Sequence, residues 1–143
     1  MTTEERFARA LHNTARSWRL AVDRRLKDLG IGQAGWMAIA TIAKASEPLS
    51  QSELASRLGV ENPTVVAMVD RLVKAGLLLR QPSPNDRRIK LLALTAQGEQ
   101  LYLRVRTEAD ALRLDLLADI DPALLAQVTT LLELLQQRAE QAG

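Results

Sequence analysis

The middle of the chain, residues 50–95, constrains the fold most, because two short helices and two strand-like segments follow one another there with little connecting chain. Ser50, with Glu53 three residues later, forms the capping-box pattern of a helix start. Gly59 predicts the end of this helix, because glycine adopts the left-handed conformation at little steric cost.

A second helix is predicted from Asn62-Pro63 to Gly76, with Asn62 as its N-cap. Val65 and Met68 have the spacing with which a helix-turn-helix makes its apolar contacts. At 100° per residue, one arc of this helix holds its valines and a leucine: Val65, Val66, Val69, Leu72 and Val73. The opposite side, which we expect to be exposed, holds Thr64, Ala67, Met68 and Arg71.

The residues after Gly76 predict a β-hairpin with strands at 77–81 and 89–94. Proline, serine and asparagine fill the connection between the strands, which ends in Asp86-Arg87-Arg88. Two short helices followed by a hairpin with a basic tip indicate a winged helix-turn-helix.

Long helices are predicted on both sides of this unit, over 4–29 and 33–45 before it and from Thr95 and from Asp121-Pro122 after it. They carry more leucine than one small winged-helix core needs. The expected fold is therefore mainly α (α+β), a single domain over residues 1–143. Residues 49–95 form its winged helix-turn-helix, and residues 1–30 and 96–143 form the helical regions that flank this unit.

The composition excludes several classes of function. The chain has no cysteine and one histidine, which excludes disulfides, thiol chemistry and a multi-histidine metal site. It also lacks a nucleophile elbow and a phosphate-binding glycine loop, so we expect neither an enzyme nor a cofactor. No signal peptide and no apolar run of about 18 residues is present, so the expected location is the cytoplasm, at the nucleoid.

The charge distribution is compatible with binding to nucleic acid. Residues 49–95 carry seven Lys or Arg against four Asp or Glu, whereas residues 96–143 carry four against eight. A basic middle region suits a polyanion, although a solvated surface explains these counts equally well.

Individual residues in 50–95 are candidates for contacts with DNA. Asn62 and Thr64 lie at the start of the second helix, where recognition helices place residues on base edges, and Arg71 can reach phosphates. Arg87 and Arg88 at the hairpin tip can enter a minor groove, and Asp86 can orient one of them. The alternative interpretation is an amphipathic helix beside a solvated basic loop.

These residues resemble a known family. Asp86-Arg87-Arg88, with Leu92-Ala93-Leu94-Thr95 and Gly98, is similar to the wing signature of MarR-type transcriptional regulators. The helix pair around Leu54-Ala55 and Gly59-Val60 and the order of all six helices fit as well. Within that family, the segment Arg16-Ser17-Trp18-Arg19, with Asp23, Arg25-Leu26-Lys27 and Trp36, most resembles the SlyA branch.

The resemblance implies a homodimer, with residues 1–30 and 96–143 as its helical dimerisation region and residues 49–95 as its DNA-binding region. Its recognition helices are then expected to enter successive major grooves of an A·T-rich pseudo-palindrome. Ser50, Pro63 and Thr64 then match positions near DNA, and Arg88 matches the minor-groove arginine, with Asp86 as its companion. Ala67 stands where SlyA-type proteins have an arginine, so the operator is expected to differ or the wing to carry more of the affinity.

The resemblance also implies a pocket for a small aromatic carboxylate such as salicylate. Arg16 and Trp36 match positions that line this pocket, and Trp18 lies beside them in sequence. A position in the core is an equally open interpretation for Trp36, and packing in the core or at an interface is the favoured one for Trp18. For Arg16, pairing at the surface or at an interface is as open as a ligand role. The predicted function is a ligand-responsive regulator that acts as a repressor or an anti-silencer. The alternative is a winged-helix protein–protein interaction module without sequence-specific DNA binding.

Overall fold

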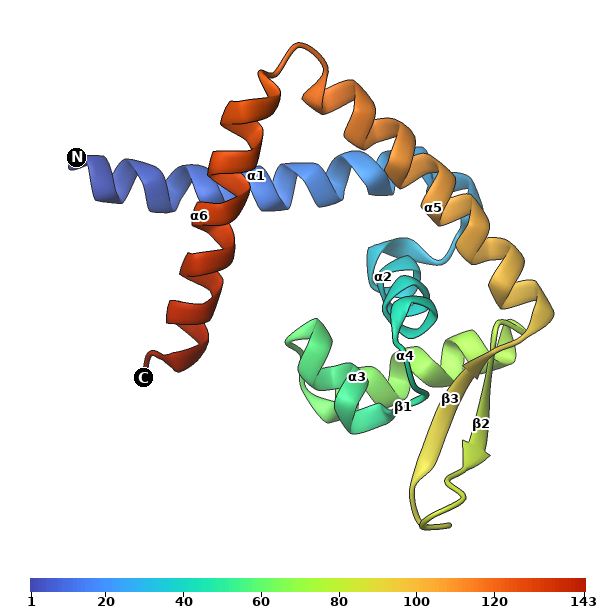
Figure 1. Ribbon diagram of the computed structural model, residues 1–143. Coiled ribbons are helices and arrows are strands. Elements are labelled where there is room, and N and C mark those ends of the chain that lie inside the picture. Colours follow the sequence, from blue (N-terminus) through green and yellow to red (C-terminus); the bar gives the residue numbers. More distant parts are fainter. The chain divides into compact units, whose positions relative to one another are not determined.

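The computed structural model describes residues 1–143, which divide into two compact units, Met1–Leu112 and Arg113–Gly143. The first unit begins with α1 (Thr3–Arg25), a short 3₁₀ helix η1 (Lys27–Leu29) and α2 (Gly32–Lys44). The strand β1 (Leu49–Ser50) leads into α3 (Gln51–Leu58) and α4 (Asn62–Lys74). The strands β2 (Leu78–Pro82) and β3 (Lys90–Leu94) form a hairpin that projects from these helices (Figure 1). Helix α5 (Ala96–Leu117) follows the hairpin.

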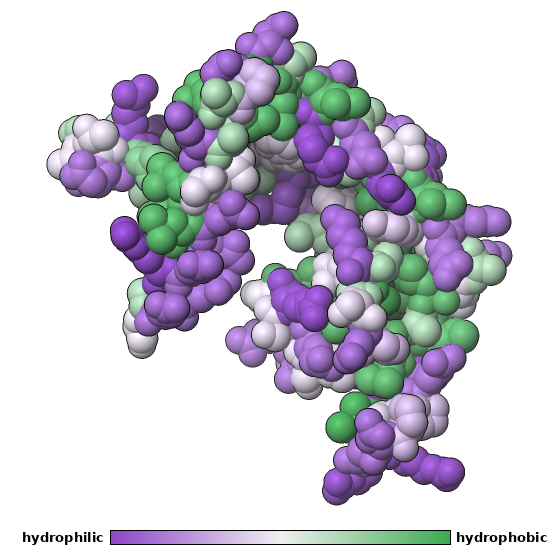
Figure 2. Space-filling view, in the orientation of Figure 1, coloured by the Kyte–Doolittle hydropathy of each residue, from purple (hydrophilic) through white to green (hydrophobic).

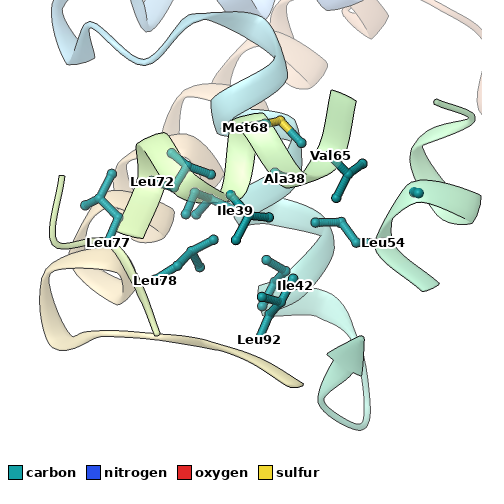
Figure 3. Packing of buried hydrophobic residues seen from close by; sticks show 12 residues of the cluster. Ala38, Ile39, Ile42, Leu54, Val65, Met68, Leu72, Leu77, Leu78 and Leu92 are labelled. Carbon is teal, nitrogen blue, oxygen red and sulfur yellow. The ribbon is translucent and has the colours of Figure 1, made fainter. Parts of the chain in front are cut away.

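The core of the first unit is built from aliphatic side chains of α2, α3, α4 and the sheet. Figure 3 shows these side chains converging between the helices and the base of the hairpin. Ile39, Leu54, Val65, Leu78 and Leu92 are almost completely buried there. Removing such side chains from water supplies about 1.5–3 kcal/mol each, so this cluster fixes α3 and α4 against α2.

The sheet has three strands in the order β1-β3-β2, all antiparallel. The hairpin predicted at 77–81 and 89–94 is confirmed with a shift of one residue at most ends. The strand β1 was not predicted. It has only two residues, paired as Leu49 with Leu92 and Ser50 with Leu91, which is too short for an alternating pattern to reveal.

The helix ends agree with the sequence at most glycines. Gly59 adopts a left-handed conformation with φ of 69° and ends α3, as predicted. The helix predicted over 4–29 instead ends at Arg25, and η1 carries the chain to Gly30. The prediction of Asn62 as an N-cap is wrong: Glu61 occupies that position, and no side chain caps α4. Pro63 lies one residue further in, where a missing N–H is still tolerated.

The base of the hairpin packs closely against the start of α5. The Thr95 hydroxyl donates a hydrogen bond to the Gly76 carbonyl at 2.6 Å and accepts one from the Gly98 N–H at 3.0 Å. The Thr95 N–H donates to the Leu77 carbonyl at 3.1 Å. A Cβ atom on Gly98 would lie 2.2 Å from that carbonyl oxygen, so only glycine fits this contact.

A second apolar cluster joins α1, α2 and α5. Val22, Leu26, Trp36, Val105 and Leu112 are buried in it. At its edge, the Arg104 guanidinium donates two hydrogen bonds of 3.0 Å to the Asp28 carboxylate. These hydrogen bonds hold the pKa of Asp28 below its usual value.

The second unit contains α6 (Pro122–Gln141), which starts as predicted at Asp121-Pro122. The Asp121 carboxylate accepts a hydrogen bond from the Leu124 N–H at 3.1 Å. No residue of α6 is buried, and its apolar side chains are exposed, including Leu124, Val128 and Leu131. No helix in the chain has both the length and the hydropathy needed to cross a membrane.

Candidate nucleic-acid interface

Helix α4 has one buried face and one exposed face. Val65, Met68, Val69 and Leu72 are buried, whereas Thr64, Val66, Ala67 and Arg71 are exposed. The expectation that Met68 lies on the exposed side is wrong, and so is the assignment of Val66 to the apolar arc. In the structure the buried face includes Met68, which packs with the core cluster, in agreement with the helix-turn-helix spacing of Val65 and Met68.

The exposed face of α4 is narrow and nearly uncharged at its start. Asn62, Pro63 and Thr64 lie exposed in the first turn, Ala67 is one turn further on, and Arg71 lies toward the C-terminal end. Small side chains near the start of a recognition helix allow its backbone to approach base edges, and an arginine further along can reach a phosphate.

Helix α3 is held at its start by the predicted capping box. The Ser50 hydroxyl accepts a hydrogen bond from the Glu53 N–H at 3.1 Å, and the Glu53 carboxylate accepts one from the Ser50 N–H at 3.0 Å. The hydrogen bond that the Glu53 carboxylate accepts from the Ser50 N–H is the main cause that lowers the pKa of Glu53. Ser50 is therefore occupied by the cap, while its side chain stays partly exposed beside the sheet.

The wing carries a fixed arginine. Arg88 donates from its backbone N–H, its Nε and its Nη2 to the Asp86 carboxylate, at 3.0, 3.1 and 3.0 Å. The Arg88 side chain is nevertheless 91% exposed, so the remaining guanidinium N–H groups face solvent. The hydrogen bonds between the two side chains, with that from the Arg88 backbone N–H, lower the pKa of Asp86, and the side-chain hydrogen bonds raise the pKa of Arg88.

The predicted pair of Asp86 and Arg88 thus exists, and it reduces the conformational freedom of the arginine before any ligand binds. Arg87 is exposed beside it with no ion pair. Figure 2 shows strongly hydrophilic side chains over this tip of the hairpin.

A three-way junction that the sequence did not reveal connects the wing to both helices. From β2, Arg80 donates from Nε to the Gln51 side chain at 2.8 Å and from Nη2 to the Asp70 carboxylate at 2.5 Å. Gln51 lies in the first turn of α3, and Asp70 lies on α4. The contacts span 29 and 10 positions, so no local pattern could have indicated them.

The three residues predicted for ligand binding have different surroundings. Trp36 is buried, and its indole N–H donates to the Asp23 carboxylate at 3.0 Å. Trp18 is half-buried and packs on the same apolar cluster, and Arg16 is exposed on α1.

A cavity of about 440 Å³ is lined by residues close in sequence to two of these three. Arg19 lies about one helical turn after Arg16, and Met37 follows Trp36. Its walls come from α1, α2, α3 and α4 and include Arg19, Ala34, Met37, Leu58, Thr64 and Met68. Arg19 is its only cation, and Thr64 and Met68 connect it directly to the recognition helix. No three His, Cys, Asp or Glu side chains lie close enough together to hold a metal ion.

Comparison with known proteins agrees with this geometry. Residues 35–90, which include most of α2, the helix-turn-helix and most of the wing, match the MarR family. The crystal structure of the transcriptional regulator PA3341 is 34% identical, with a TM-score of 0.89 over 95% of this chain and 99% of that chain.

Two further structures share the fold at lower identity. Staphylococcus aureus MarR in complex with salicylate and kanamycin is 21% identical, with a TM-score of 0.86 over 98% of this chain and 94% of that one. The transcriptional regulator SlyA is 17% identical, with a TM-score of 0.83 over 94% of each chain. This chain therefore belongs to the MarR family, whose members are DNA-binding transcriptional regulators and not enzymes.

Proposed function

We propose that two copies of the chain bind an A·T-rich pseudo-palindromic operator, with α4 of each copy in a major groove and Arg88 in the adjacent minor groove. The observation that carries this proposal is the pairing of Arg88 with Asp86. The carboxylate fixes the arginine but leaves most of it exposed, at the tip of a wing that Arg80 ties to α4. A narrow A·T minor groove has the negative potential that attracts such an arginine.

Exposed apolar residues on the flanking helices support the dimer. On α1, Phe7 and Leu11 are about 40% exposed, and α6 has no buried residue although leucines and a valine line it. Water-exposed rows of this kind are typical of helices that pack against a second chain. In a twofold dimer, equivalent recognition helices contact half-sites about 34–36 Å apart.

Fluorescence anisotropy with a duplex selected from a random library tests the DNA interface. Arg88→Ala is expected to weaken binding about 10- to 100-fold, because a groove-reading arginine contributes about 1–3 kcal/mol. Arg106→Ala is the matched control, since Arg106 lies on α5 outside α3, α4 and the wing, and it should bind like the wild type.

The salt dependence provides a second readout. The slope of log K against log salt should be steep in the wild type, because each neutralised phosphate releases counterions. If no duplex sequence is enriched, and Arg88→Ala binds like the Arg106→Ala control, the proposed reading of DNA is wrong. The winged helix would then be a protein–protein interaction module.

We further propose that a small aromatic carboxylate such as salicylate releases the DNA by entering the cavity beside α4. Arg19 supplies a cation for the carboxylate, Met37 and Leu58 supply apolar walls, and Thr64 transmits occupancy to the recognition helix. Salicylate is bound by the Staphylococcus aureus MarR named above, which shares this fold.

Substitution of Arg16 and Arg19, which lie three residues apart on α1, tests the proposed effector site. Arg19→Gln should abolish release by salicylate at concentrations that release the wild type, whereas Arg16→Gln should leave it unchanged. The opposite result would assign the carboxylate to the position that the sequence resemblance favours. Release that neither variant affects would exclude both arginines as carboxylate ligands.

The SlyA-branch assignment and the anti-silencing role are parts of the same proposal. They rest on the residues that resemble SlyA, two of which, Asp23 and Trp36, are hydrogen-bonded to each other. Ala67→Arg tests the departure in the recognition helix. It should change which base pair the selected operator prefers at one position per half-site, because arginine reads guanine.

A further inference from the structure

A groove that the proposed function does not use lies beside β3. It has a volume of about 480 Å³ and is bounded by the end of α2, residues 45–48, β3 and the start of α5. It shares no lining residue with the cavity beside α4. Its volume falls within the range of small-molecule sites, about 300–1,000 Å³.

The walls of this groove are mainly apolar. Leu92 forms a completely buried part of the wall, Leu94 and Tyr102 are half-buried, and Leu103 is 58% exposed at the rim. The exposed side chain of Leu103 therefore adds apolar surface at the rim that the fold does not bury and that a ligand can contact.

The charged groups of the groove are all of one sign. Glu47 and Glu99 line it, and no lysine, arginine or histidine does. Both carboxylates are exposed, and neither accepts a hydrogen bond or forms an ion pair within the protein. The two arginines of α5 that lie nearest to Glu99 in sequence pair with other carboxylates, Arg104 with Asp28 and Glu108, and Arg106 with Asp110.

We propose that this groove binds a small organic cation, an ammonium group carried on an apolar or aromatic body. The two unpaired carboxylates attract the ammonium group, the ring of Tyr102 provides a face on which a cation can rest, and the leucines accept the apolar body. An aromatic acid is repelled by the same carboxylates. The groove therefore selects a ligand of opposite charge to the acid proposed for the cavity beside α4.

The position of the groove gives such a ligand access to the DNA-binding elements. Residues 45–48 lead directly into β1 and Ser50, and Leu92–Leu94 belong to the central strand of the sheet. The binding proposal itself does not depend on the proposed DNA recognition, because it is tested on the protein without DNA.

Isothermal titration calorimetry of the full chain with benzyltrimethylammonium tests the proposal. Benzyl alcohol is the uncharged control ligand, and phenylacetate is the anionic one. We expect measurable binding of the cation alone. Glu47→Gln and Glu99→Gln should each weaken it about 2- to 5-fold, as expected for exposed charges, and the double variant about tenfold.

Glu108→Gln is the matched control variant, because Glu108 is on the same helix as Glu99 but does not line the groove. Glu47 and Glu99 are exposed and Glu108 is half-buried, so the three substitutions should leave the circular dichroism melt unchanged. Amide chemical shifts should move at residues 45–48 and 92–103 on titration.

Three results would overturn the proposal. The first is the absence of binding at millimolar cation. The second is equal binding of benzyl alcohol, which would mean that the carboxylates contribute nothing. The third is a cation site elsewhere. Unchanged affinity of the double variant would show this, and so would amide chemical shift changes confined to residues outside 45–48 and 92–103.

Discussion

The contact between Gly98 and the Leu77 carbonyl predicts a large cost for one added methyl group. In Gly98→Ala the new Cβ would lie 2.2 Å from the carbonyl oxygen, whereas an ordinary contact is about 3.5–4.0 Å. Backbone cannot rotate away as a side chain can, so α5 must move from the base of the wing. Overpacking of this kind costs about 1–3 kcal/mol.

The same movement strains the hydrogen bonds that Thr95 makes to Gly76 and Leu77. Losing both adds about 2 kcal/mol, and the better helix propensity of alanine returns about 1 kcal/mol. The expected net loss of unfolding free energy is therefore about 2–4 kcal/mol. Overpacking less the propensity gain would by itself cost about 0–2 kcal/mol, so the two hydrogen bonds make up a large part of the expected loss.

Urea denaturation followed by circular dichroism measures this loss as a lower midpoint at an unchanged slope. Protomer concentration must be held fixed, because association stabilises the folded state by mass action. Gln97→Ala is the matched control: its position on α5 is exposed, and the substitution should shift the midpoint little. A Gly98→Ala variant as stable as the wild type would refute the argument.

Three further predictions use the same denaturation assay. Ser50→Ala removes the capping box of α3 and should cost about 0.5–2 kcal/mol, so an unchanged midpoint would show that the cap contributes nothing. Arg80→Met and Asp70→Ala, measured singly and together, should show a favourable coupling of about 0.2–1 kcal/mol; strictly additive effects would count against the junction. The pKa of Asp28 is lowered in the folded protein by its hydrogen bonds to Arg104, so its stabilisation is present at neutral pH and is lost as the pH falls below about 4. Asp28→Asn should therefore lower stability at pH 7 more than at pH 3, and an equal loss at both values would contradict this assignment.

Local sequence signals predicted the helices of the winged unit well. The capping box at Ser50 and the left-handed Gly59 act within four residues, so the sequence contains their complete cause. The wing pair of Asp86 and Arg88 is equally local. These features were predictable because their partners are neighbours in the chain.

The errors arose where distant parts of the chain decide the outcome. Met68 was placed on the exposed side because the arc was centred on the valines, whereas packing against α2 and α3 turns the buried face toward Met68 and leaves Val66 exposed. Asn62 was expected to cap α4, but the chain enters the helix one residue earlier, at Glu61.

The lining of the cavity beside α4, the site proposed for the effector, was also not predictable from local spacing. Helical spacing could not distinguish Arg16 from Arg19, since both lie on α1 three residues apart. Only the packing of α1 against α2 and the helix-turn-helix places Arg19 in the cavity wall. The junction of Arg80 with Gln51 and Asp70 could not be predicted either, because its partners are 29 and 10 positions away in the sequence.

The central position of β3 in the sheet constrains the spacing of the two DNA features that each protomer is proposed to contact. Because β3 pairs with β1 on one side and β2 on the other, the wing is bonded at its base to the segment that begins α3. For the proposed operator, the distance from the bases facing α4 to the minor groove facing Arg88 is therefore fixed by the protein. One inserted base pair displaces these two features by about 3.4 Å along the DNA and should disrupt one of the two contacts. The protein should therefore accept only half-sites in which these two features are separated by one fixed number of base pairs.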